Sequence, residues 1–586
     1  MAEKIVSPGV FTKEVDQSFL PAGVQAIGAA VIGPTQKGPA GIPTIVSSYS
    51  EFVQTFGGKF SSGSGANEDS YKYFTNYAAQ EYLKYADTLT VVRVAPGATP
   101  ATSPVTSSIT IHPTHESASF TLTTLSDGAG QNSFTATEGT NNVLSNGTEN
   151  NLRYEINSLN NAKGTFNLLI RRGDDTVRRK VILEQFNNLT LDPNSPNYIA
   201  RQIGDQVQQV RDGGTLDPFL QLSGSFQNRS KFVRVTVHQQ TYNYLDSNGN
   251  IRVGAASGSL PANQSGSFNG ASDGTSKTAP IAFYENISNT NTQGIAVGAT
   301  AGKNAYIDAI RLLKNQDEYD INLLSLPGLI DNFANHAEIL TEAINMVEDR
   351  ADCFLVIDPV EYGSAISSAT GKAEARDSNY VAEYWPWVKI PDADLGRNVW
   401  VPASTVIPSV YAFNDRVAAP WFATAGLNRG GIDIAVQTER KLTHSNRDTL
   451  YESNLNPIAT FPNSGVVVFG QKTLQKKASA LDRVNVRRLL INAKKFIAST
   501  TKFLIFENNT AATRNRFLSL VNPYFESVQQ RQGLYAFKVV MDESNNTPDV
   551  IDRNQMVGQI FLQPAKAAEF IIIDFNILPT GAAFPE

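Results

Sequence analysis

Two short glycine-bearing motifs have residue types and spacing that could support chemistry. Gly270-Ala271-Ser272-Asp273-Gly274 matches a nucleophile elbow, in which a serine at a strained strand-to-helix turn attacks a carbonyl carbon. No apolar strand precedes Ser272, and its surroundings are rich in Gly and Ser, so we interpret this motif as a loop. Gly298 to Asn304 is similar to a phosphate-binding loop, but it is one residue short, and Asn304 replaces the Ser or Thr that would hold magnesium. Helix capping is the better interpretation of the second motif.

Candidate metal ligands and nucleophiles are scattered along the chain. His112 and His115 are the only close pair among five histidines, and no third ligand follows at a metal-like spacing. Cys353 lies inside an apolar run, which is typical of a buried small hydrophobe. Three aspartates flank the end of that run, where sites of α/β proteins often lie: Asp349, Asp352 and Asp358. No nucleophile or base accompanies them, so we interpret them as caps and turn formers. We therefore predict no catalytic, cofactor-binding or metal-binding residues.

A basic segment near the C-terminus is the strongest candidate for a binding site. From Ser464 to Val540 the chain has 13 Lys and Arg against 3 Asp and Glu, a net charge of +10, although the whole chain is −6. The apolar spacing predicts a long helix from Leu474 to Ser499. Seven positive residues crowd the opposite arc of this helix: Lys476, Lys477, Arg483, Arg487, Arg488, Lys494 and Lys495. A solvated face usually mixes charge signs, so the pattern favours binding to a negative surface over simple solvation.

The chain alternates in composition in a way that predicts several domains, about four for 586 residues. Residues 21–96 and 301–455 show strands and helices in alternation, and a strand, a helix at Asn332 to Arg350 and the strand Cys353 to Ile357 indicate a βαβ unit. Residues 97–300 are rich in Ser, Thr, Asn and Gly, with short alternating strands and one expected helix, Asn197 to Val210. The pattern predicts an α+β / α/β multidomain protein, with a discontinuous α/β middle domain that carries residues 97–300 as a β-rich insertion.

The remaining residues complete this expected organisation. Residues 384–461 are rich in Pro, Trp and Gly, which is typical of extended connections. Residues 456–566 are expected to form an α+β C-terminal domain, with a strand at Lys502 to Phe506 and a helix capped by Asn509 or Thr510.

The sequence predicts an extended arm at each end of the chain. Residues 1–20 contain Ser7-Pro8-Gly9, which blocks a helix, followed by a short extended stretch that includes Val10, Phe11 and Val15. In residues 567–586, Phe570 to Ile577 alternates with period two, so that Ile571, Ile573 and Phe575 share an apolar face. An ordinary first strand, and a last strand that closes its own domain's sheet, remain open alternatives.

Composition limits the environment and the partners. One cysteine excludes an internal disulfide framework and fits synthesis in a reducing cytoplasm. The start shows no apolar segment of a secretory signal, and no apolar run approaches the roughly 20 residues that span a bilayer. The acidic balance argues against nucleic acid as the main partner.

Several stretches, in order, resemble one family. "LDRVNVRRLLINAKKFI", "FENNTAATRNRF" and the closing block from "RQGLYAFKVV" to "EFIIIDFNI" resemble the C-terminal domain of the tail sheath proteins of contractile bacteriophages and related injection machines. "SPGVFTKEVD" is similar to the sheath N-terminal arm, and "GAAVIGPTQKGPAGIPTIVSSYSEFVQTFGG" to the opening of the sheath middle domain. "NLTLDPNSPNYI", "WPWVKIPD" and "VPASTVIPSVYAFNDRVAAPWFATAGLNRG" extend the resemblance, which covers the insertion only weakly.

This resemblance implies a structural protein and not an enzyme. Sheath subunits form hexameric rings that stack helically around a tail tube and contract on a baseplate signal, driving the tube through the host envelope. The C-terminal domain would lie against the tube, the insertion would face outward, and terminal arms would exchange strands between subunits. The implied partners are other copies, the tail tube, and baseplate and tail terminator proteins, with no nucleic acid and no membrane insertion. The protein would be made in the host cytoplasm and reside in the virion tail. Two alternatives are an α/β hydrolase with β-rich accessory domains and a carbohydrate-binding surface protein.

Overall fold

The computed structural model describes most of the chain, which forms two compact units. The described residues are 28–62, 69–107, 118–133, 147–215, 217–252, 258–274, 283–569 and 571. Among them, Ala493–Gln563 forms one compact unit, and the others, Gly28–Asn492 and the few residues from Pro564 on, form another. The division falls inside helix α10 (Val484–Thr501).

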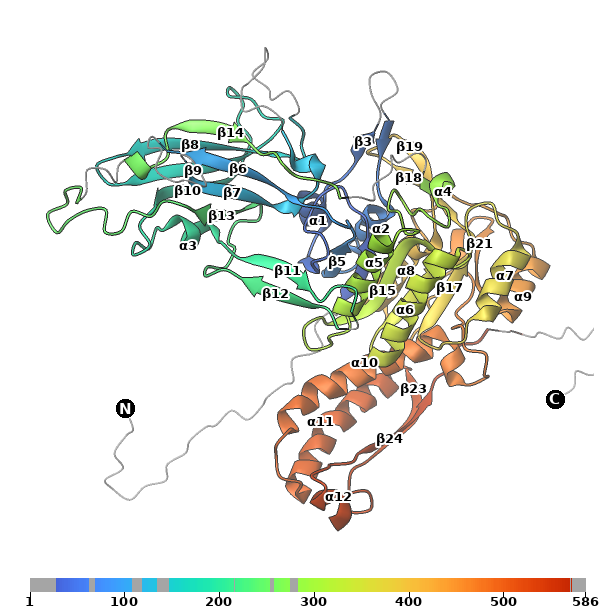
Figure 1. Ribbon diagram of the computed structural model, residues 1–586. Helices are drawn as coiled ribbons and strands as arrows, with labels where there is room; N and C mark the ends of the chain where they lie inside the picture. The colour runs from blue at the N-terminus through green and yellow to red at the C-terminus, as the bar shows by residue number, and fades with distance from the viewer. Residues whose placement is uncertain are drawn as a thin grey trace, which may run out of the picture. The chain divides into compact units, whose positions relative to one another are not determined.

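An eight-stranded sheet organises the larger unit (Figure 1). Its strands, in spatial order, are β2 (Thr44–Val46), β5 (Leu89–Arg93), β1 (Gly28–Gly33), β15 (Ile321–Ile330), β16 (Phe354–Asp358), β17 (Val381–Trp385), β21 (Asn456–Phe461) and β22 (Gly465–Val468). Neighbours from β5 to β21 run parallel, whereas β2 and β22 are antiparallel edge strands. Strands from before residue 97 and after residue 300 therefore lie in one sheet. Strands β1, β5, β16 and β17 are buried along their whole length, as expected of strands covered on both faces.

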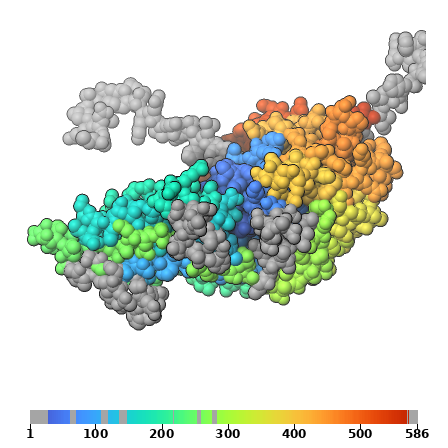
Figure 2. Space-filling model, turned by 90° about the horizontal axis from the view of Figure 1, so that it is seen from above, coloured from blue at the N-terminus to red at the C-terminus, as the bar shows by residue number. Residues whose placement is uncertain are grey.

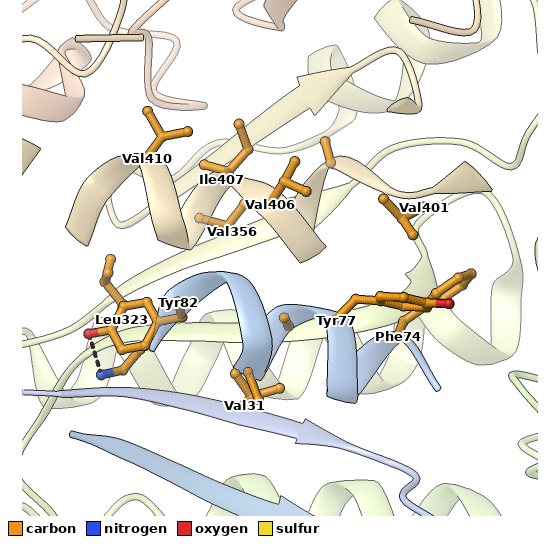
Figure 3. Packing of buried hydrophobic residues seen from close by; sticks show 14 of the residues in the cluster. Val31, Phe74, Tyr77, Tyr82, Leu323, Val356, Val401, Val406, Ile407 and Val410 are labelled. Atoms are coloured by element: carbon orange, nitrogen blue, oxygen red, sulfur yellow. Dashed lines mark hydrogen bonds between the residues drawn. The ribbon is translucent and has the colours of Figure 1, made fainter. Parts of the chain in front are cut away.

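Alternate side chains of the sheet enter two separate cores. Along β1, Ala29 and Val31 belong to one core, and Ala30 and Ile32 belong to the other, because successive strand residues point to opposite faces. Helices α2 (Phe74–Tyr82) and α8 (Ala403–Val417) supply the first core, as Figure 3 shows. The Tyr82 hydroxyl there accepts a hydrogen bond from the Ala29 N–H at 3.0 Å, which fixes α2 to the sheet. The second core is supplied by α5 (Thr300–Leu312), α6 (Ala334–Arg350), α7 (Ile366–Ala375) and α9 (His444–Glu452).

Smaller elements complete this unit. They are α1 (Tyr49–Phe56), β3 (Phe60–Ser62), β4 (Asp69–Tyr71), α4 (Phe283–Asn286), β18 (Val388–Asp392), β19 (Arg397–Val401) and β20 (Gln437–Thr438). Of these strands, β3 pairs with β4, and β18 lies between β19 and β20. In the described part of the chain, no helix combines the length and the apolar character needed to cross a membrane.

Two sheets packed face to face build the insertion. One contains β10 (Ile182–Thr190), β9 (Thr165–Arg172), β8 (Leu152–Asn160) and β14 (Gln264–Ser267), and the other contains β13 (Val233–Val237), β7 (Ala118–Asp127) and β6 (Pro100–Thr106). They share a core in which Phe120 of β7 stacks on Phe166 of β9 at 5.8 Å between ring centroids. In Figure 2 the cyan and green atoms of this region lie together in the left part of the view. A short helix α3 (Ile199–Ile203) and the hairpin β11 (Val207–Arg211) with β12 (Phe219–Ser223) complete this region.

The insertion ends earlier than the predicted range 97–300. Its two ends meet, since a Cβ on Gly274 would lie 1.9 Å from the Pro96 carbonyl oxygen and Thr99 N–H donates to Ser272 C=O. Where the described chain resumes, Phe283 and Ile287 already belong to the first core of the large sheet, and Ile295 and Val297 belong to the second. Residues 283–300 therefore contribute to the two cores of the large sheet and not to the core of the insertion.

The smaller unit is built from helices and two strands. It contains the second half of α10, then α11 (Ala511–Gln530), β23 (Leu534–Val540), α12 (Pro548–Asp552) and β24 (Gln559–Pro564). Phe517, Val521 and Phe525 on one side of α11 are buried, and Phe496 stacks on Tyr524 at 4.0 Å. Thr510 caps α11 through its hydroxyl, which confirms that prediction. This unit begins later than the predicted boundary at 456, because β21 and β22 extend the large sheet.

Three local predictions are wrong. Residues 384–461 contain α8 and α9 and not only extended connections; Pro408 lies inside α8, whose burial outweighs the lost backbone hydrogen bond. The helix expected at 197–210 ends at Ile203 and is followed by β11. The strand expected at 502–506 is a short 3-10 turn, Lys502–Leu504.

Candidate functional site

The seven positive residues predicted to share one helix do not share it. α10 begins only at Val484, and the preceding residues include an extended segment in which Lys472 pairs with Arg483. The Leu474 N–H donates to the Val381 carbonyl, which holds this stretch against the start of β17. Lys476 and Lys477 follow it as exposed residues outside any helix. The helical prediction for 474–483 is therefore wrong, because tertiary pairing outweighs the local helical pattern.

Two of the seven are buried and already have partners within the larger unit. The Arg487 guanidinium lies 4.1 Å from the centroid of the Tyr380 ring, and Nη2 donates to Asn379 Oδ1 at 2.7 Å. Only 4% of Arg487 is exposed, so its charge is directed to these partners and not to solvent. The structure therefore corrects the expectation that this residue belongs to a free basic face.

Arg488 is held in a similar way. Its Nη2 donates to Asp415 Oδ2 at 2.5 Å, and its guanidinium lies 4.6 Å from the Tyr411 ring centroid. Burial raises the pKa of the Asp415 carboxyl, although the Arg488 charge opposes that shift. Arg488 thus fastens the first half of α10 to α8, and Arg487 fastens it to the residues directly before β17. Val484 and Ile491 of α10 belong to the first core of the sheet.

Arg483 belongs to a polar cluster around Glu569. Its Nε and Nη2 donate to the two carboxylate oxygens of Glu569 at 2.7 and 2.9 Å, a bidentate pair. Gln471 Nε2 donates to Oε1 at 3.1 Å, and the Tyr451 hydroxyl donates to Oε2 at 2.9 Å. Burial alone would raise the pKa of Glu569, but the hydrogen bonds from these three side chains outweigh it and leave the pKa lowered.

The last two predicted residues lie in the smaller unit. Lys494 is exposed and Lys495 is buried, on the part of α10 that carries Phe496. Of the seven positive residues, only Lys476, Lys477 and Lys494 are therefore exposed in the described chain. Lys476 and Lys477 belong to the larger unit and Lys494 to the smaller one.

The hairpin of the smaller unit presents exposed apolar side chains. β23 and β24 form a sheet of two strands, so each has a backbone edge that no other described strand covers. Tyr535 on β23 is 65% exposed and Phe561 on β24 is 56% exposed. Exposed apolar residues on an open strand edge are typical of a surface that receives another strand.

Most of the predicted arm residues fall outside the described residues. Val10, Phe11, Val15, Ile573 and Phe575 are among them. Ile571 is described and is 81% exposed, two residues beyond the Glu569 cluster.

The candidate catalytic residues that lie among the described residues have structural roles. Ser272 lies in an exposed stretch paired with Thr99, and Lys303 at the start of α5 pairs with Glu338. Asp358 accepts hydrogen bonds from Ser404 N–H at 2.9 Å and from its hydroxyl at 2.5 Å, and so caps α8. Cys353 is buried, and His112 and His115 are not among the described residues. Within the described ranges, no group of three or more His, Cys, Asp and Glu residues is placed to hold a metal ion.

Comparison with protein families gives two matches that adjoin along the chain. Residues 283–474 match the phage tail sheath protein central domain, and residues 476–577 match the phage tail sheath C-terminal domain. Together they cover about half of the 586 residues. The chain belongs to the phage tail sheath family. The first match begins at Phe283, where the described chain re-enters the core of the large sheet.

Individual members of the tail sheath family are also similar to this chain. The tail sheath protein of Vibrio phage KVP40 is 40% identical over 210 residues, 36% of this chain and 30% of that protein. The tail sheath protein of Salmonella phage ViI is 29% identical over 324 residues, 52% of this chain and 51% of that protein. The matches thus span about a third to a half of these relatives' own length.

A solved structure extends the likeness to the fold. The crystal structure of a sheath tail protein from Listeria innocua aligns with 92% of this chain and 95% of its own, with a TM-score of 0.51 and 10% sequence identity. At that identity the alignment concerns the fold alone, which is a mixed α/β arrangement of several domains.

The sequence did not reveal the cluster around Glu569 in this sheath-family chain. Glu569 is separated by 86 residues from Arg483, by 98 from Gln471 and by 118 from Tyr451, and no local pattern connects them. The basic count did select Arg483, but for an exposed role. Only the fold, which brings these segments together, assigns its partner.

Proposed function

We propose that this chain is the structural subunit of a contractile tail sheath, which polymerises around a tail tube and contracts to drive the tube through the host cell envelope. The observation that carries the proposal is the pair of adjoining family matches, central domain followed by C-terminal domain. The role is structural and not catalytic. The protein would act in the virion tail, after synthesis in the host cytoplasm.

Assembly would rest on strand exchange between copies in hexameric rings stacked helically. The open edges of β23 and β24, with exposed Tyr535 and Phe561, support this proposal. The expected donors are the N-terminal arm with Val10, Phe11 and Val15, and the C-terminal strand with Ile571, Ile573 and Phe575. An added strand would pair the free backbone groups and cover the apolar side chains.

A tube surface of negative charge is the second proposed contact. Of the predicted basic set, Lys476, Lys477 and Lys494 are exposed in the described chain, and their exposure supports this contact. A single exposed pair contributes about 0–1 kcal/mol, so binding requires the array repeated over many subunits. Baseplate and tail terminator proteins would bind the two ends of the sheath. The insertion, residues 98–274, would face outward.

The two alternative functions receive no support from the described residues. A hydrolase would need a base oriented towards Ser272, which sits in a loop and accepts a hydrogen bond from Gly274 N–H. A carbohydrate-binding role for the insertion has no observation in its favour. We therefore keep only the sheath proposal.

Electron microscopy of the purified chain, alone and with the tail tube protein, tests the proposal. We expect tubes or stacked rings, and longer sheaths where the tube protein is present. Reversing Lys476 and Lys477 to Glu should leave the melting temperature unchanged and reduce co-assembly with tubes, because both side chains are exposed. Arg483, Arg487 and Arg488 should not be part of that variant, because their substitution would disturb buried contacts. Dispersed monomers under all conditions would contradict the proposal, and normal sheath on tubes from the lysine variant would contradict the role of the lysines.

A further inference from the structure

The turn between α10 and α11 exposes three large apolar side chains. Phe503 is 73% exposed, Ile505 is 59% exposed and Phe506 is fully exposed. Leu504, which lies among them, is buried and anchors the turn. Isolated apolar residues are common on protein surfaces, but adjacent ones of this size are typical of a surface that binds a partner.

Hydrogen bonds fix the backbone of this turn. Phe506 has a φ of 71°, in the left-handed region that bulky side chains rarely adopt. Glu507 N–H donates to the Leu504 carbonyl at 3.2 Å, and Asn509 Nδ2 donates to the Gln555 carbonyl at 2.9 Å. The Cα–Cβ bond of Phe506 therefore has a fixed direction, which reduces the conformational entropy lost when the ring binds a partner.

The larger unit contains a pocket whose walls are mainly aromatic. Its volume is about 270 Å³. The aromatic residues that line it are Tyr71, Phe74, Tyr77, Phe283, Tyr284 and Trp400. Of these, Phe74 and Tyr77 belong to α2 and are labelled in Figure 3. A cavity of about 150 Å³ holds a benzene molecule, so this pocket has room for a phenyl ring.

Arg397 gives this pocket a positive charge at its exposed side. Its Nη2 donates to the Ser70 carbonyl at 2.8 Å, and its guanidinium lies 5.6 Å from the centroid of the Tyr71 ring. Lys72, the other cation that lines the pocket, is paired with Asp394 at 2.9 Å. Arg397 is exposed and forms no ion pair with a described residue. The pocket thus combines an apolar interior with a cation that can bind a carboxylate.

We propose that Phe506 of one copy of the chain fills this aromatic pocket on a second copy, where the carboxylate of Glu507 pairs with Arg397. The inference rests on the proposed sheath function, since it assigns a contact between copies. Glu507 directly follows Phe506, is exposed, and forms no ion pair within the described ranges. The ring and the carboxylate therefore match the apolar interior and the positive charge of the pocket.

A second copy is favoured over the pairing of two identical turns. At about 200 Å² for each large side chain, the three exposed residues of the turn would bury about 600 Å² on each copy. A standard interface buries about 800 Å² per partner, so two turns alone would not hold a dimer. A single ring in a pocket with aromatic walls is instead the geometry of an interface hot spot. Because the turn and the pocket are different parts of the chain, the contact can repeat from copy to copy in a ring or a helix.

The first test compares Phe506→Ala with Phe219→Ala in the full-length chain. Phe219 on β12 is 50% exposed and serves as the matched control. Phe506→Ala should keep the melting temperature of the intact chain, because the ring is exposed. Its critical concentration for assembly, measured by sedimentation, should rise about tenfold or more, as expected for the loss of a hot-spot residue.

Two results of this comparison would overturn the inference. Equal critical concentrations for the two variants would do so and would leave the sheath function in place. If Phe506→Ala assembled alone like the intact chain but no longer bound the tail tube protein, the turn would belong to the tube contact instead.

An exchange of charges tests the proposed ion pair. Glu507→Arg alone and Arg397→Glu alone should each raise the critical concentration, because each places like charges opposite one another. Both substitutions in one chain should restore part of the assembly, which two independent structural defects would not do. A double variant as defective as the sum of the two single variants would contradict the pair.

Cross-linking shows whether the contact joins two copies. Chains with Glu507→Cys are mixed with chains with Asn398→Cys, which lines the pocket; Cys353, the one native cysteine, is buried. We expect a disulfide-linked dimer under oxidising conditions, and none when Glu543→Cys, at an exposed position of the smaller unit, replaces Glu507→Cys.

The cross-link is read independently of sheath formation. Absence of the dimer would overturn the inference, and so would a disulfide that forms only within chains carrying both Glu507→Cys and Asn398→Cys. Failure of the intact chain to form rings or tubes, with or without the tail tube protein, would contradict the proposed function. A dimer from the mixture would still support the contact in that case.

Discussion

Two buried carboxyls stand out at the scale of single residues. Asp358 ends β16 and caps α8, and burial raises its pKa to about 7 although hydrogen bonds from Ser404 and Ala403 oppose that shift. Glu383, on the neighbouring strand β17, is fully buried; neither of its carboxyl oxygens has a hydrogen-bond partner, and burial raises its pKa well above the ordinary value. Groups of this kind bind protons more tightly in the folded chain than in the unfolded one.

Asp358 should therefore make stability fall as pH rises. Its pKa is near the ordinary value of 3.8 when unfolded and about 7 when folded, so its contribution is present below about pH 4 and is lost as pH rises to about 7. Asp358→Asn keeps the cap and removes the titration. The free energy of unfolding of the intact chain relative to this variant should drop by on the order of 3 kcal/mol between pH 4.5 and pH 8.

Urea unfolding of both proteins across that range measures this difference. Asp349→Asn is the control, since Asp349 is an exposed carboxylate that pairs with Lys314 at the surface. The interpretation fails if the two aspartate variants follow the same pH profile.

At the scale of elements, the hairpin of β23 and β24 gives the clearest separation of folding from assembly. Tyr535 and Phe561 are more than half exposed, so replacing both with Ser should change the free energy of unfolding by about 0.5 kcal/mol or less each. Assembly should nevertheless be lost or need a much higher protein concentration, because an incoming strand would lose its apolar contacts. Sedimentation and chemical unfolding on the same sample measure both effects.

Two exposed residues of the insertion provide a matched control for Tyr535 and Phe561. Tyr242 is 63% exposed and Leu222 is 54% exposed, and replacing both with Ser removes similar apolar area. We expect this control to assemble normally. Normal assembly of the Tyr535/Phe561 variant would show that the hairpin does not receive a strand.

At the scale of the whole molecule, the insertion should be separable if it is cut at its true ends. Replacing residues 98–273 with a short Gly/Ser linker joins positions that already lie together, because Gly274 packs against Pro96 and Gly97. The cores of the large sheet remain complete in this variant. We expect one cooperative thermal transition and an unchanged α/β circular dichroism signature.

Replacing residues 97–300 instead should abolish that transition. This longer deletion also removes Phe283, Ile287, Ile295 and Val297 from the two cores, and each large apolar residue lost from a core costs about 2–4 kcal/mol. Differential scanning calorimetry compares the two variants directly. A cooperative transition in both, or in neither, would contradict the boundary at Phe283.

The sequence by itself predicted those helices, strands and caps that depend mainly on interactions between residues close together in the chain. The βαβ unit was predicted at Asn332 to Arg350 and Cys353 to Ile357, and the structure has α6 at Ala334–Arg350 and β16 at Phe354–Asp358, paired parallel with β15. The cap at Thr510 was also predictable from the sequence, because a side-chain hydroxyl and a backbone N–H three residues away suffice to form it.

Only the tertiary structure decided which charges are free and which are paired. The count of +10 between Ser464 and Val540 is a property of the sequence, but Arg487 and Arg488 lie under Tyr380 and Tyr411, and Arg483 binds Glu569. Their partners are remote in the chain, and no periodicity encodes such a distance. α8 was missed for a similar reason: Pro408 opposes a helix locally, whereas burial on the sheet favours it. Sequence patterns predict a helix, strand or cap when neighbouring residues supply most of its stability. Where burial or pairing with a distant segment supplies it, only the tertiary structure shows the outcome.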